Sequence, residues 1–255
     1  MKVAKPYTLL AEHYDRNYAD FRESPIRMYG GWLRAPLKGA RCICDLACGT
    51  GQLAAELAGR GYRVTAVDQS PQMVRLARRR AALLGGRMRV VEGDMRRFAP
   101  KERFDVVTCF FDSLNHLERR SELSAVFQRA AAMLDPGGWF VFDMNTKAGV
   151  AFCWPDPPEA EEGTSGGVRY WKITRGLPFD ARAWQGGVQI DWFLERGGGR
   201  VEHVREMYCE VAWSHRETVT ALKRAGFCDI EHVDGSKIER RLAPGLRRYY
   251  RARKS

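Results

Sequence analysis

Residues 45–53, "DLACGTGQL", directly follow the short apolar run 42–44, which is typical of a buried strand. Gly49 and Gly51 allow the backbone of such a loop to approach a ligand closely. Asp45 stands four residues before Gly49 and places a carboxylate beside the loop. A strand, a glycine loop and a helix in this order predict a ligand that contacts the loop backbone. The chemistry of Asp45 decides whether that ligand carries phosphates.

Two ligand classes fit this loop. "GTGQLA" approximates the dinucleotide pattern G-x-G-x-x-A, and Asp68 lies 19 residues after Gly49, where a ribose-binding acid belongs. S-adenosylmethionine (SAM) makes the same demands but carries a cationic ammonium and sulfonium in place of phosphates. Asp45 attracts those cations, whereas it would repel a pyrophosphate. The loop therefore favours SAM.

Further polar residues follow the next predicted strands. Asp94 and Met95 in "EGDMRRF" come after the third strand, and "FFDSLNH", residues 110–116, comes after the fourth. Ligands of open α/β sheets bind outside the carboxyl ends of the strands. Asp45, Asp68, Asp94 and the 110–116 segment all fall at that edge, so we expect one site there.

Regular elements must position these residues. Strands are predicted at 41–47, 63–67, 88–91, 104–109 and 139–142, and helices at 52–58, 71–84 and 121–134. Ser70 and Pro71 form a helix N-cap and first turn. Strands that alternate with helices predict a parallel sheet covered by helices on both faces.

The flanking regions follow other patterns. Residues 7–38 have helical spacing, and 154–167, rich in Pro, Gly and acids, predicts a mobile loop or lid. Strand-like runs at 168–175, 184–195 and 200–212 predict an antiparallel insertion with a hairpin turn at Gly197–Gly199. Ser214 and Glu217 form a capping box for a helix to 225, and strands at 228–233 and 248–254 end the chain. We expect four parts: an N-terminal helical cap, a Rossmann-like core, a loop and β insertion forming a substrate roof, and a closing helix and strands, at 1–40, 41–150, 151–212 and 213–255.

With these motifs in place, the sequence resembles the class I SAM-dependent methyltransferases. The resemblance is carried over about 41–143 by "DLACGTG", "VTAVDQSPQMVRLAR", "VVEGDMRRF", "FDVVTCFFDSLNHL" and "LDPGGWFVFD". It implies a seven-stranded, mostly parallel sheet with one antiparallel strand. The segments "EHYDRNY" and "YGGW" and the insertion after strand five are similar to small-molecule enzymes, namely the glycine N-methyltransferase-like and amino-sugar N,N-dimethyltransferase groups.

The resemblance also implies roles for cofactor-binding residues. Glycines line the methionine portion, Asp45 orders the loop and the ammonium, Asp68 holds the ribose hydroxyls, two methionines sandwich the adenine, Asp94 reads its amino group, and Phe110 walls the sulfonium side. The full predicted set is Asp45, Ala47, Gly49, Gly51, Asp68, Gln69, Met73, Asp94, Met95 and Phe110. SAM is the implied cofactor and S-adenosylhomocysteine (SAH) its product.

The acceptor side is less defined by the motifs. Tyr14 and His116 are the catalytic candidates, although Tyr14 also fits a helix core and His116 also fits a role in holding the cofactor. The candidates for substrate contact are Phe111, Asp112, Asn115 and Trp171. Trp171, Trp184 and Trp192 form either a substrate roof or the insertion's own small core. Glycine-type enzymes hold the substrate carboxylate with an early arginine, for which Arg22 and Arg27 are candidates.

Composition limits the partners. The 255 residues carry a formal net charge of +11, and +7 of it lies in residues 237–255. Such an excess suits anionic partners or a solvated surface. The motif "DPPE" at 156–159 follows strand five, not strand four, where enzymes that methylate nucleic-acid amines carry their related motif. We therefore expect no nucleic-acid partner.

The cysteines and apolar segments narrow the class further. Seven cysteines without a CxxC pair predict neither a disulfide framework nor a metal site. No run of about 18 apolar residues and no signal-peptide pattern occurs, so we expect a cytoplasmic protein with no membrane partner, as a monomer or homodimer.

The leading hypothesis is transfer of a methyl group from SAM to an N or O nucleophile of a small molecule. The alternatives are an RNA or protein methyltransferase, an NAD-dependent oxidoreductase, and a SAM-binding protein without catalysis.

Overall fold

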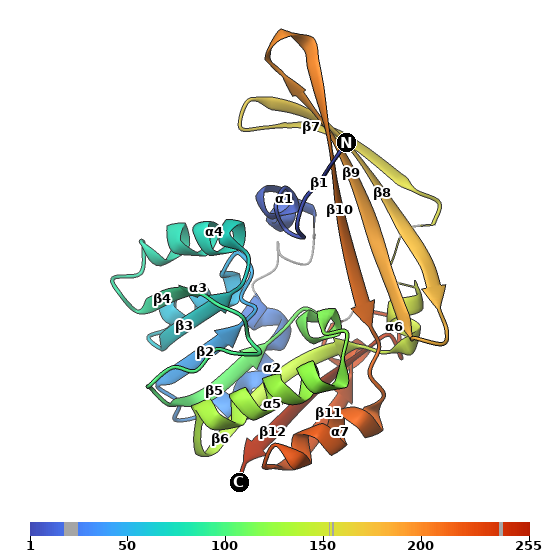
Figure 1. The fold of residues 1–255 in the computed structure, drawn as a ribbon. Helices are drawn as coiled ribbons and strands as arrows, with labels where there is room; N and C mark the ends of the chain where they lie inside the picture. The colour runs from blue at the N-terminus through green and yellow to red at the C-terminus, as the bar shows by residue number, and fades with distance from the viewer. Residues whose placement is uncertain (18–24, 153, 155, 240–241) are drawn as a thin grey trace.

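The structure is a computed structural model that describes residues 1–17, 25–152, 154, 156–239 and 242–255. Its main body is a seven-stranded sheet in the order β11-β12-β6-β5-β2-β3-β4 (Figure 1). The neighbouring strands β6, β5, β2, β3 and β4 pair in parallel, whereas β12 is antiparallel to both β6 and β11. The strands are β2 (Cys42–Leu46), β3 (Arg63–Asp68), β4 (Met88–Glu92), β5 (Phe104–Cys109), β6 (Leu134–Asn145), β11 (Phe227–Asp234) and β12 (Arg247–Lys254). The predicted α/β class with a mostly parallel sheet is confirmed.

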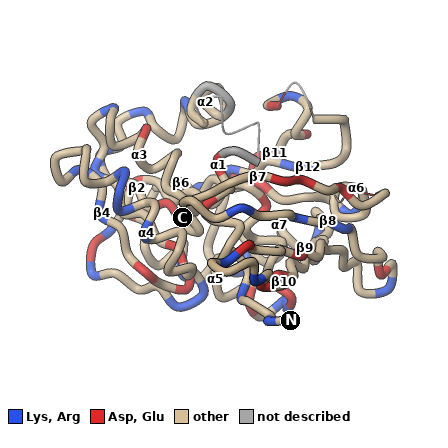
Figure 2. The backbone as a smooth tube through the Cα atoms, turned by 90° about the horizontal axis from the view of Figure 1, so that it is seen from above, with Lys and Arg blue, Asp and Glu red and all other residues tan. Residues whose placement is uncertain are grey.

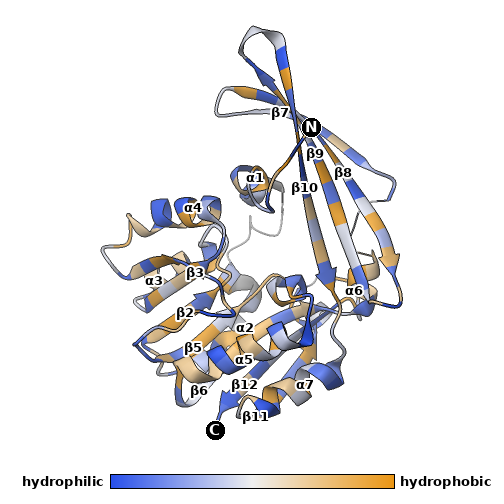
Figure 3. Ribbon diagram, in the orientation of Figure 1, coloured by the Kyte–Doolittle hydropathy of each residue, from blue (hydrophilic) through white to orange (hydrophobic). Residues whose placement is uncertain are grey.

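Helices cover both faces of this sheet, as the alternation of strands and helices predicted. One face packs on α5 (Arg120–Met133) and α7 (His215–Arg224). The other packs on α2 (Pro25–Leu37), α3 (Gln52–Gly59) and α4 (Pro71–Ala81). Neighbouring strand residues alternate between the two cores, so Ile43 packs with the α2–α4 side and Cys44 with the α5 side. Figure 3 shows apolar segments in the core strands and many polar residues on α4.

A second sheet stands upright above one side of the core and has the order β1-β10-β9-β8-β7 (Figure 1). Its strands are β1 (Lys2–Val3), β7 (Glu159–Ser165), β8 (Val168–Asp180), β9 (Gln185–Arg196) and β10 (Arg200–Val211). The predicted alternation is confirmed, because Val188, Ile190, Trp192 and Leu194 all face one buried cluster. Residues 197–199 form the hairpin turn.

The predicted loop at 154–167 is wrong for its second half. Residues 159–165 form β7, which pairs antiparallel with β8 from Glu159↔Thr174 to Ser165↔Val168. The acids that suggested a solvated loop (red in Figure 2) form cross-strand ion pairs, Lys172 with Glu161 and Arg169 with Glu162. A charged edge strand of this kind also discourages pairing with other chains.

The N-terminal segment contains two separate helices. Helix α1 (Leu10–Asn17) lies between the inserted sheet and α4, and α2 packs beneath the core sheet (Figure 1). Arg22 and the side chain of Arg27 lie outside the described part of the chain. Among the described helices, none has the length and apolarity that a bilayer crossing needs.

Two boundaries differ from the sequence-based expectation. Strand β6 begins at Leu134, so "DPGG" lies within the strand and not before it. A short helix that the sequence did not predict, α6 (Lys147–Phe152), follows β6 and contacts β9 of the inserted sheet. It connects the core to the insertion.

Candidate functional site

A cavity of about 270 Å³ opens at the carboxyl-end edge of the core sheet. Its floor comes from residues that follow β2, β3, β4 and β5, and its opposite wall comes from Tyr7, Tyr14 and the β10 residues 207–209. A neighbouring space of about 40 Å³ shares Ala47, Gly49 and Phe111 with it and lies against Asp45 and Phe110. We call the two spaces the main cavity and the inner cavity. The core and the insertion thus build the walls together.

The glycine loop bends sharply between β2 and α3. Ala47, Gly49 and Gly51 all have positive φ, at 52°, 55° and 80°. A Cβ on Gly49 would meet nothing within 4 Å, and Gly49 lines both cavities, so the backbone is open to a ligand there. A Cβ on Gly51 would lie 2.8 Å from Met88 Cε and 3.0 Å from Ala77 Cβ. Gly51 therefore serves the packing of α3 on its neighbours and lines neither cavity.

Asp68 ends β3 and lines the main cavity. Its Oδ2 accepts from the Gly49 N–H at 2.9 Å and its Oδ1 from the Ser70 N–H at 2.8 Å. Burial raises the pKa of this carboxyl, and hydrogen bonds from the backbone amides of Ser70, Gly49 and Gln69 oppose that rise. Each carboxylate oxygen has two acceptor sites, so Asp68 retains capacity for ligand hydroxyls.

Asp45 lies next to the inner cavity and is only 3% exposed. Burial raises its pKa to about 7, while the hydrogen bond from Thr108 lowers it and the charge of Asp68 raises it further. Thr108 Oγ1 donates to Asp45 Oδ1 at 2.6 Å. A cation in the cavity would keep this carboxyl ionised.

The remaining predicted cofactor residues divide into two groups. Gln69, Met73 and Met95 line the main cavity, and Ser70, the N-cap of α4, accepts from the Met73 N–H at 3.3 Å. Asp94 lines neither cavity, because Arg96 binds both of its oxygens and holds the pKa of the carboxyl below its usual range. Asp94 therefore shapes the loop after β4.

Both catalytic candidates line the main cavity, and His116 has a defined tautomer. Its Nδ1 lies 3.0 Å from the Cys209 carbonyl, which only accepts, so Nδ1 carries the hydrogen. Its Nε2 is then the acceptor for the Tyr7 hydroxyl at 3.1 Å. Tyr14 packs edge-on to Tyr7, with ring centroids 5.9 Å apart. Sequence analysis missed Tyr7, which is the hydroxyl in contact with His116.

Tyr7 is held in an uncommon conformation by the inserted sheet. Its φ is 62°, and its N–H donates to the Tyr208 hydroxyl at 3.0 Å. Glu206, fully buried, accepts from the next three amides, those of residues 8–10, and from Trp192 Nε1 at 2.9 Å. Strain that the surroundings hold in place is frequent at functional sites. The available signal was Glu206 itself, an acid at a core position of an alternating strand.

Two predicted substrate residues, Asp112 and Asn115, belong to a different group of side chains, and that prediction is corrected here. Asn115 is fully buried; its Nδ2 donates to the carbonyls of Asn145 and Val211, and its Oδ1 accepts from the Asn145 N–H at 2.9 Å. Asp112 accepts from Arg247 at 2.6 Å and from Asn145 Nδ2 at 2.7 Å. We call this group the frame cluster; its members are Asp112, Asn115, Asp143, Asn145, Glu210 and Arg247.

The frame cluster holds several acids around one cation. Burial raises the pKa of Asp143 to about 7 and raises that of Glu210, while Arg247 lowers both. Arg247 pairs with Asp112 and Asp143, and Asn145 Nδ2 also donates to Glu210 at 2.9 Å. The cluster therefore joins β6, β10, β12 and the loop after β5, and most of its polar atoms bond to one another, whereas Asp143 Oδ1 is buried without a hydrogen-bond partner among the described residues.

Trp171 is also corrected, because it lines neither cavity. It follows Tyr170, which packs in the buried cluster of the inserted sheet, so Trp171 points to the opposite face. There the Arg169 guanidinium lies 4.8 Å from its ring centre. Trp192 is fully buried and fills the core of the insertion, which was the other interpretation of these tryptophans.

Phe111 and Phe110 lie beside the cavities, and their roles toward substrate and cofactor stay predictions. Phe111 lines both cavities and Phe110 lines the inner one. Both follow directly after β5. In the part of the chain that the structure describes, no three His, Cys, Asp or Glu side chains gather as a metal site would require.

Comparison with known proteins gives consistent matches. Residues 43–138 match the family described as a methyltransferase domain. A Geobacillus sp. (strain WCH70) protein described as a methyltransferase is 33% identical over 230 residues, 88% of this chain and 90% of that protein. The dTDP-3-amino-3,6-dideoxy-alpha-D-glucopyranose N,N-dimethyltransferase of Streptomyces fradiae is 39% identical over 106 residues, 41% of this chain and 39% of that one. The structure of an S-adenosylmethionine-dependent methyltransferase from Clostridium acetobutylicum aligns with a TM-score of 0.74 at 21% identity, covering 98% of this chain and 99% of that one.

Proposed function

The chain belongs to the class I SAM-dependent methyltransferases, and from that premise we propose that it methylates an amine nitrogen or hydroxyl oxygen of a small molecule. The observation that carries the proposal is the main cavity, in which Asp68 and Gly49 face Tyr7, Tyr14 and His116. Its volume of about 270 Å³ suits small ligands. The partial likeness to an amino-sugar dimethyltransferase supports a small acceptor.

The residues present fit SAM. Asp68 has acceptor sites left for ribose hydroxyls, and Gly49 offers an open backbone beside it. Asp45 is buried and its pKa is raised to about 7, and a neighbouring ammonium would hold its carboxylate ionised. Met73 and Met95 supply polarizable walls for an adenine ring. When bound, SAM supplies a methyl group on a cationic sulfur.

Tyr7 and His116 are proposed to receive the proton of the acceptor. The lone pair of the acceptor would form the new bond to the methyl carbon as the carbon–sulfur bond breaks and leaves its electron pair on sulfur, and the acceptor would then lose one proton if it entered as a neutral amine or a hydroxyl. The Tyr7 oxygen takes that proton while its own hydrogen moves to His116 Nε2, along the existing 3.1 Å contact. The Cys209 carbonyl, bound to Nδ1–H, stabilises the resulting imidazolium.

Phe111 and Tyr14 are proposed to wall the acceptor and to exclude water, since both line the main and inner cavities. Alignment of the acceptor with the methyl group is the main contribution that the enzyme must make. Gly51 and Asp94 are proposed to support the site indirectly. Gly51 allows α3 to pack closely on its neighbours, and Asp94 binds Arg96 in the loop after β4.

A calorimetric titration of the purified protein with SAM, SAH, NAD(H) and NADP(H) tests the cofactor. We expect saturable binding of SAM and SAH alone. A screen with methyl-labelled SAM against amines and hydroxylated metabolites then tests the acceptor class. Binding of a nicotinamide cofactor, or methylation restricted to RNA or protein, would overturn the proposal.

A further inference from the structure

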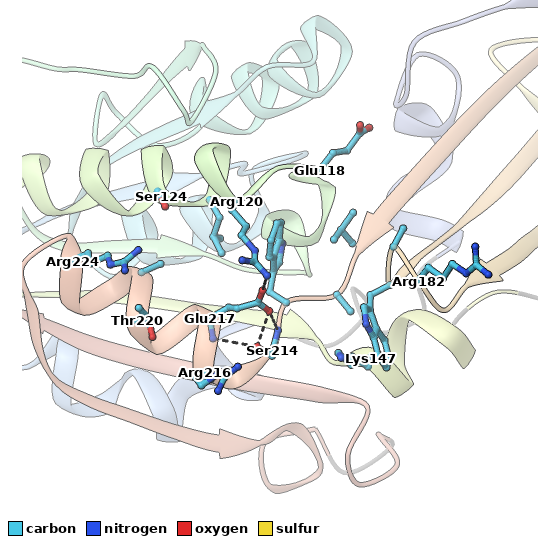
Figure 4. A pocket seen from close by; sticks show the side chains of 17 residues that line it. Glu118, Arg120, Ser124, Lys147, Arg182, Ser214, Arg216, Glu217, Thr220 and Arg224 are labelled. Carbon is cyan, nitrogen blue, oxygen red and sulfur yellow. Dashed lines mark hydrogen bonds and ion pairs between the residues drawn. The ribbon is translucent and has the colours of Figure 1, made fainter.

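A second and larger hollow, of about 1000 Å³, lies where the inserted sheet joins the core. It is bounded by the first turn of α5, by α7 along its length from Arg216 to Arg224, by the turn between β8 and β9, and by the segment that follows β10 (Figure 4). We call it the basic groove, after its five cationic lining residues: Arg120, Lys147, Arg182, Arg216 and Arg224. The proposed reaction does not use it.

The positive charge of the groove is only partly neutralised. Glu217 pairs with Arg120, and the same carboxylate accepts from the Ser214 N–H and hydroxyl at 2.9 and 2.7 Å. Glu118 is the other acid in the lining, so the five cations outnumber the acids by three. A cleft lined by charges of one sign concentrates its field on a ligand of the opposite sign.

Three arginines are available for such a ligand. Arg182, Arg216 and Arg224 are exposed, and among the described residues none of them has an ion-pair partner. Figure 4 shows them spread along the groove, with Arg224 and Arg182 toward opposite ends. Guanidinium groups bind phosphate and carboxylate oxygens with paired hydrogen bonds.

Trp184 lines the groove and has an uncommon backbone conformation. Its φ is 53°, which is rare for a bulky side chain. The Lys147 Nζ lies 3.0 Å from the centre of its ring, and Phe179 packs edge-on at 6.0 Å. Strain of this kind is retained where the surroundings hold a residue in place for a role.

The groove adjoins the proposed active site at one residue. Glu118 lines both the basic groove and the main cavity. It lies between η2 (Ser113–His116), which carries His116, and the start of α5. One elongated molecule that passes Glu118 would contact both sites.

We propose that the basic groove binds an anionic group, a phosphate ester or a carboxylate, that the methyl acceptor carries at a distance from its methyl-accepting atom. The inference rests on the proposed function, because it takes the main cavity as the place of methyl transfer. The Arg182–Arg216 side of the groove then sets which acceptors are used.

Calorimetry with inorganic pyrophosphate and with citrate, at low salt, tests the groove. The groove variant is Arg182→Ala with Arg216→Ala. The matched control is Arg78→Ala with Arg79→Ala, which removes the same charge from exposed positions on α4, away from the groove. We expect at least one anion to bind, about tenfold more weakly to the groove variant and within about twofold of wild type to the control, a difference of about 1.4 kcal/mol. SAH affinity should be equal in all three proteins.

Equal anion affinity in the groove variant and the control would overturn the proposal. Tighter binding of a single-stranded RNA oligonucleotide, lost in the groove variant and steeply salt-dependent, would also overturn it and assign the groove to a polyanion. Tighter binding of pyrophosphate than of citrate would indicate that the acceptor carries a phosphate ester, and the reverse order would indicate a carboxylate. Failure of SAH to bind wild-type protein would instead sink the proposed function, whatever the anions do.

Discussion

Two groups of buried or half-buried carboxylates have different kinds of partner in this molecule. Beside the cavities, Asp45 accepts from a threonine hydroxyl and Asp68 from backbone amides. In the frame cluster, Asp112 and Asp143 pair with Arg247, and Glu210 accepts from the Asn145 amide. The first group borders open space, whereas the second fills its own interior.

This difference in partners separates carboxylates that can bind a ligand from carboxylates that hold the fold together. A carboxylate satisfied by one or two neutral donors retains its charge and acceptor sites for a ligand. A carboxylate that shares a cation or an amide with other acids is held by partners from other segments, and its role is to hold elements together. Asp112 and Phe111 are neighbours in the sequence, but they belong to opposite sides of this division.

The largest expected effect is on the frame cluster. Arg247→Met removes the cation that faces Asp112 and Asp143 and leaves buried acids unpaired. We expect a loss of about 3–5 kcal/mol in the free energy of unfolding, measured with a chemical denaturant. The matched control on the same strand, the exposed Arg253→Met, should cost less than about 1 kcal/mol. Equal losses in the two variants would show that the cluster is not a frame.

The next effect concerns the cavity group. Asp68→Ala should weaken SAH binding by roughly 100-fold to 1000-fold, because a charged acceptor of ligand hydroxyls is lost. Asp105→Ala is the control, since Asp105 also accepts from two backbone amides, Arg41 and Cys42, at 2.7 and 2.8 Å. It stands at the start of β5, at the other end of the sheet. Calorimetry should find its SAH affinity unchanged; a comparable weakening would mean that Asp68 acts only through loop structure.

Two consecutive residues sharpen the comparison further. His116→Ala should lower kcat by about 100-fold with SAH affinity retained, because the proposed proton acceptor is lost. Asn115→Ala should instead lower the free energy of unfolding by about 1–3 kcal/mol, because buried partners lose their hydrogen bonds. Steady-state kinetics and denaturant unfolding of both variants, with an acceptor from the labelling screen, check this. Unaltered kcat in His116→Ala would remove the base from the mechanism.

The smallest effect, at about 1.4 kcal/mol for each pH unit, is on pH dependence. The pKa of Asp45 is raised to about 7 in the folded state, against about 3.9 in the unfolded chain, so the folded state binds the extra proton between these values. Its contribution to stability is present below about pH 4 and is lost as pH rises toward 7. Relative to wild type, Asp45→Asn should therefore gain about 1.4 kcal/mol per pH unit between about pH 4 and pH 7.

Saturating SAH should separate the two carboxylate groups. A bound ammonium keeps Asp45 ionised, so this pH-dependent difference should shrink when SAH is present. The corresponding difference for Asp143→Asn, whose pKa is also raised to about 7, should remain. Denaturant unfolding at several pH values, with and without SAH, measures both. A difference for Asp45→Asn that SAH leaves untouched would place the ammonium elsewhere.

Prediction from sequence succeeded where local rules suffice. The core strands, the glycine loop, the α4 cap and the alternation of β9 all follow from periodicity and turn chemistry. Prediction failed for β7, because the pairing of its acids with Lys172 and Arg169 is a contact between strands that composition does not reveal. The same limit explains Trp171, whose side of the sheet depends on the register of β8.

Sequence alone thus determined the family, the order of core elements and the residues at the carboxyl ends of the first three strands, since each follows from a short contiguous motif. Only the tertiary structure decided which side chains after β5 line the cavity and which hold the frame. Only the tertiary structure places Tyr7 next to His116, 109 positions away in the sequence, because Glu206 binds the backbone amides that follow Tyr7. Contacts between distant segments depend on how the inserted sheet is placed on the core, and no local pattern encodes that placement.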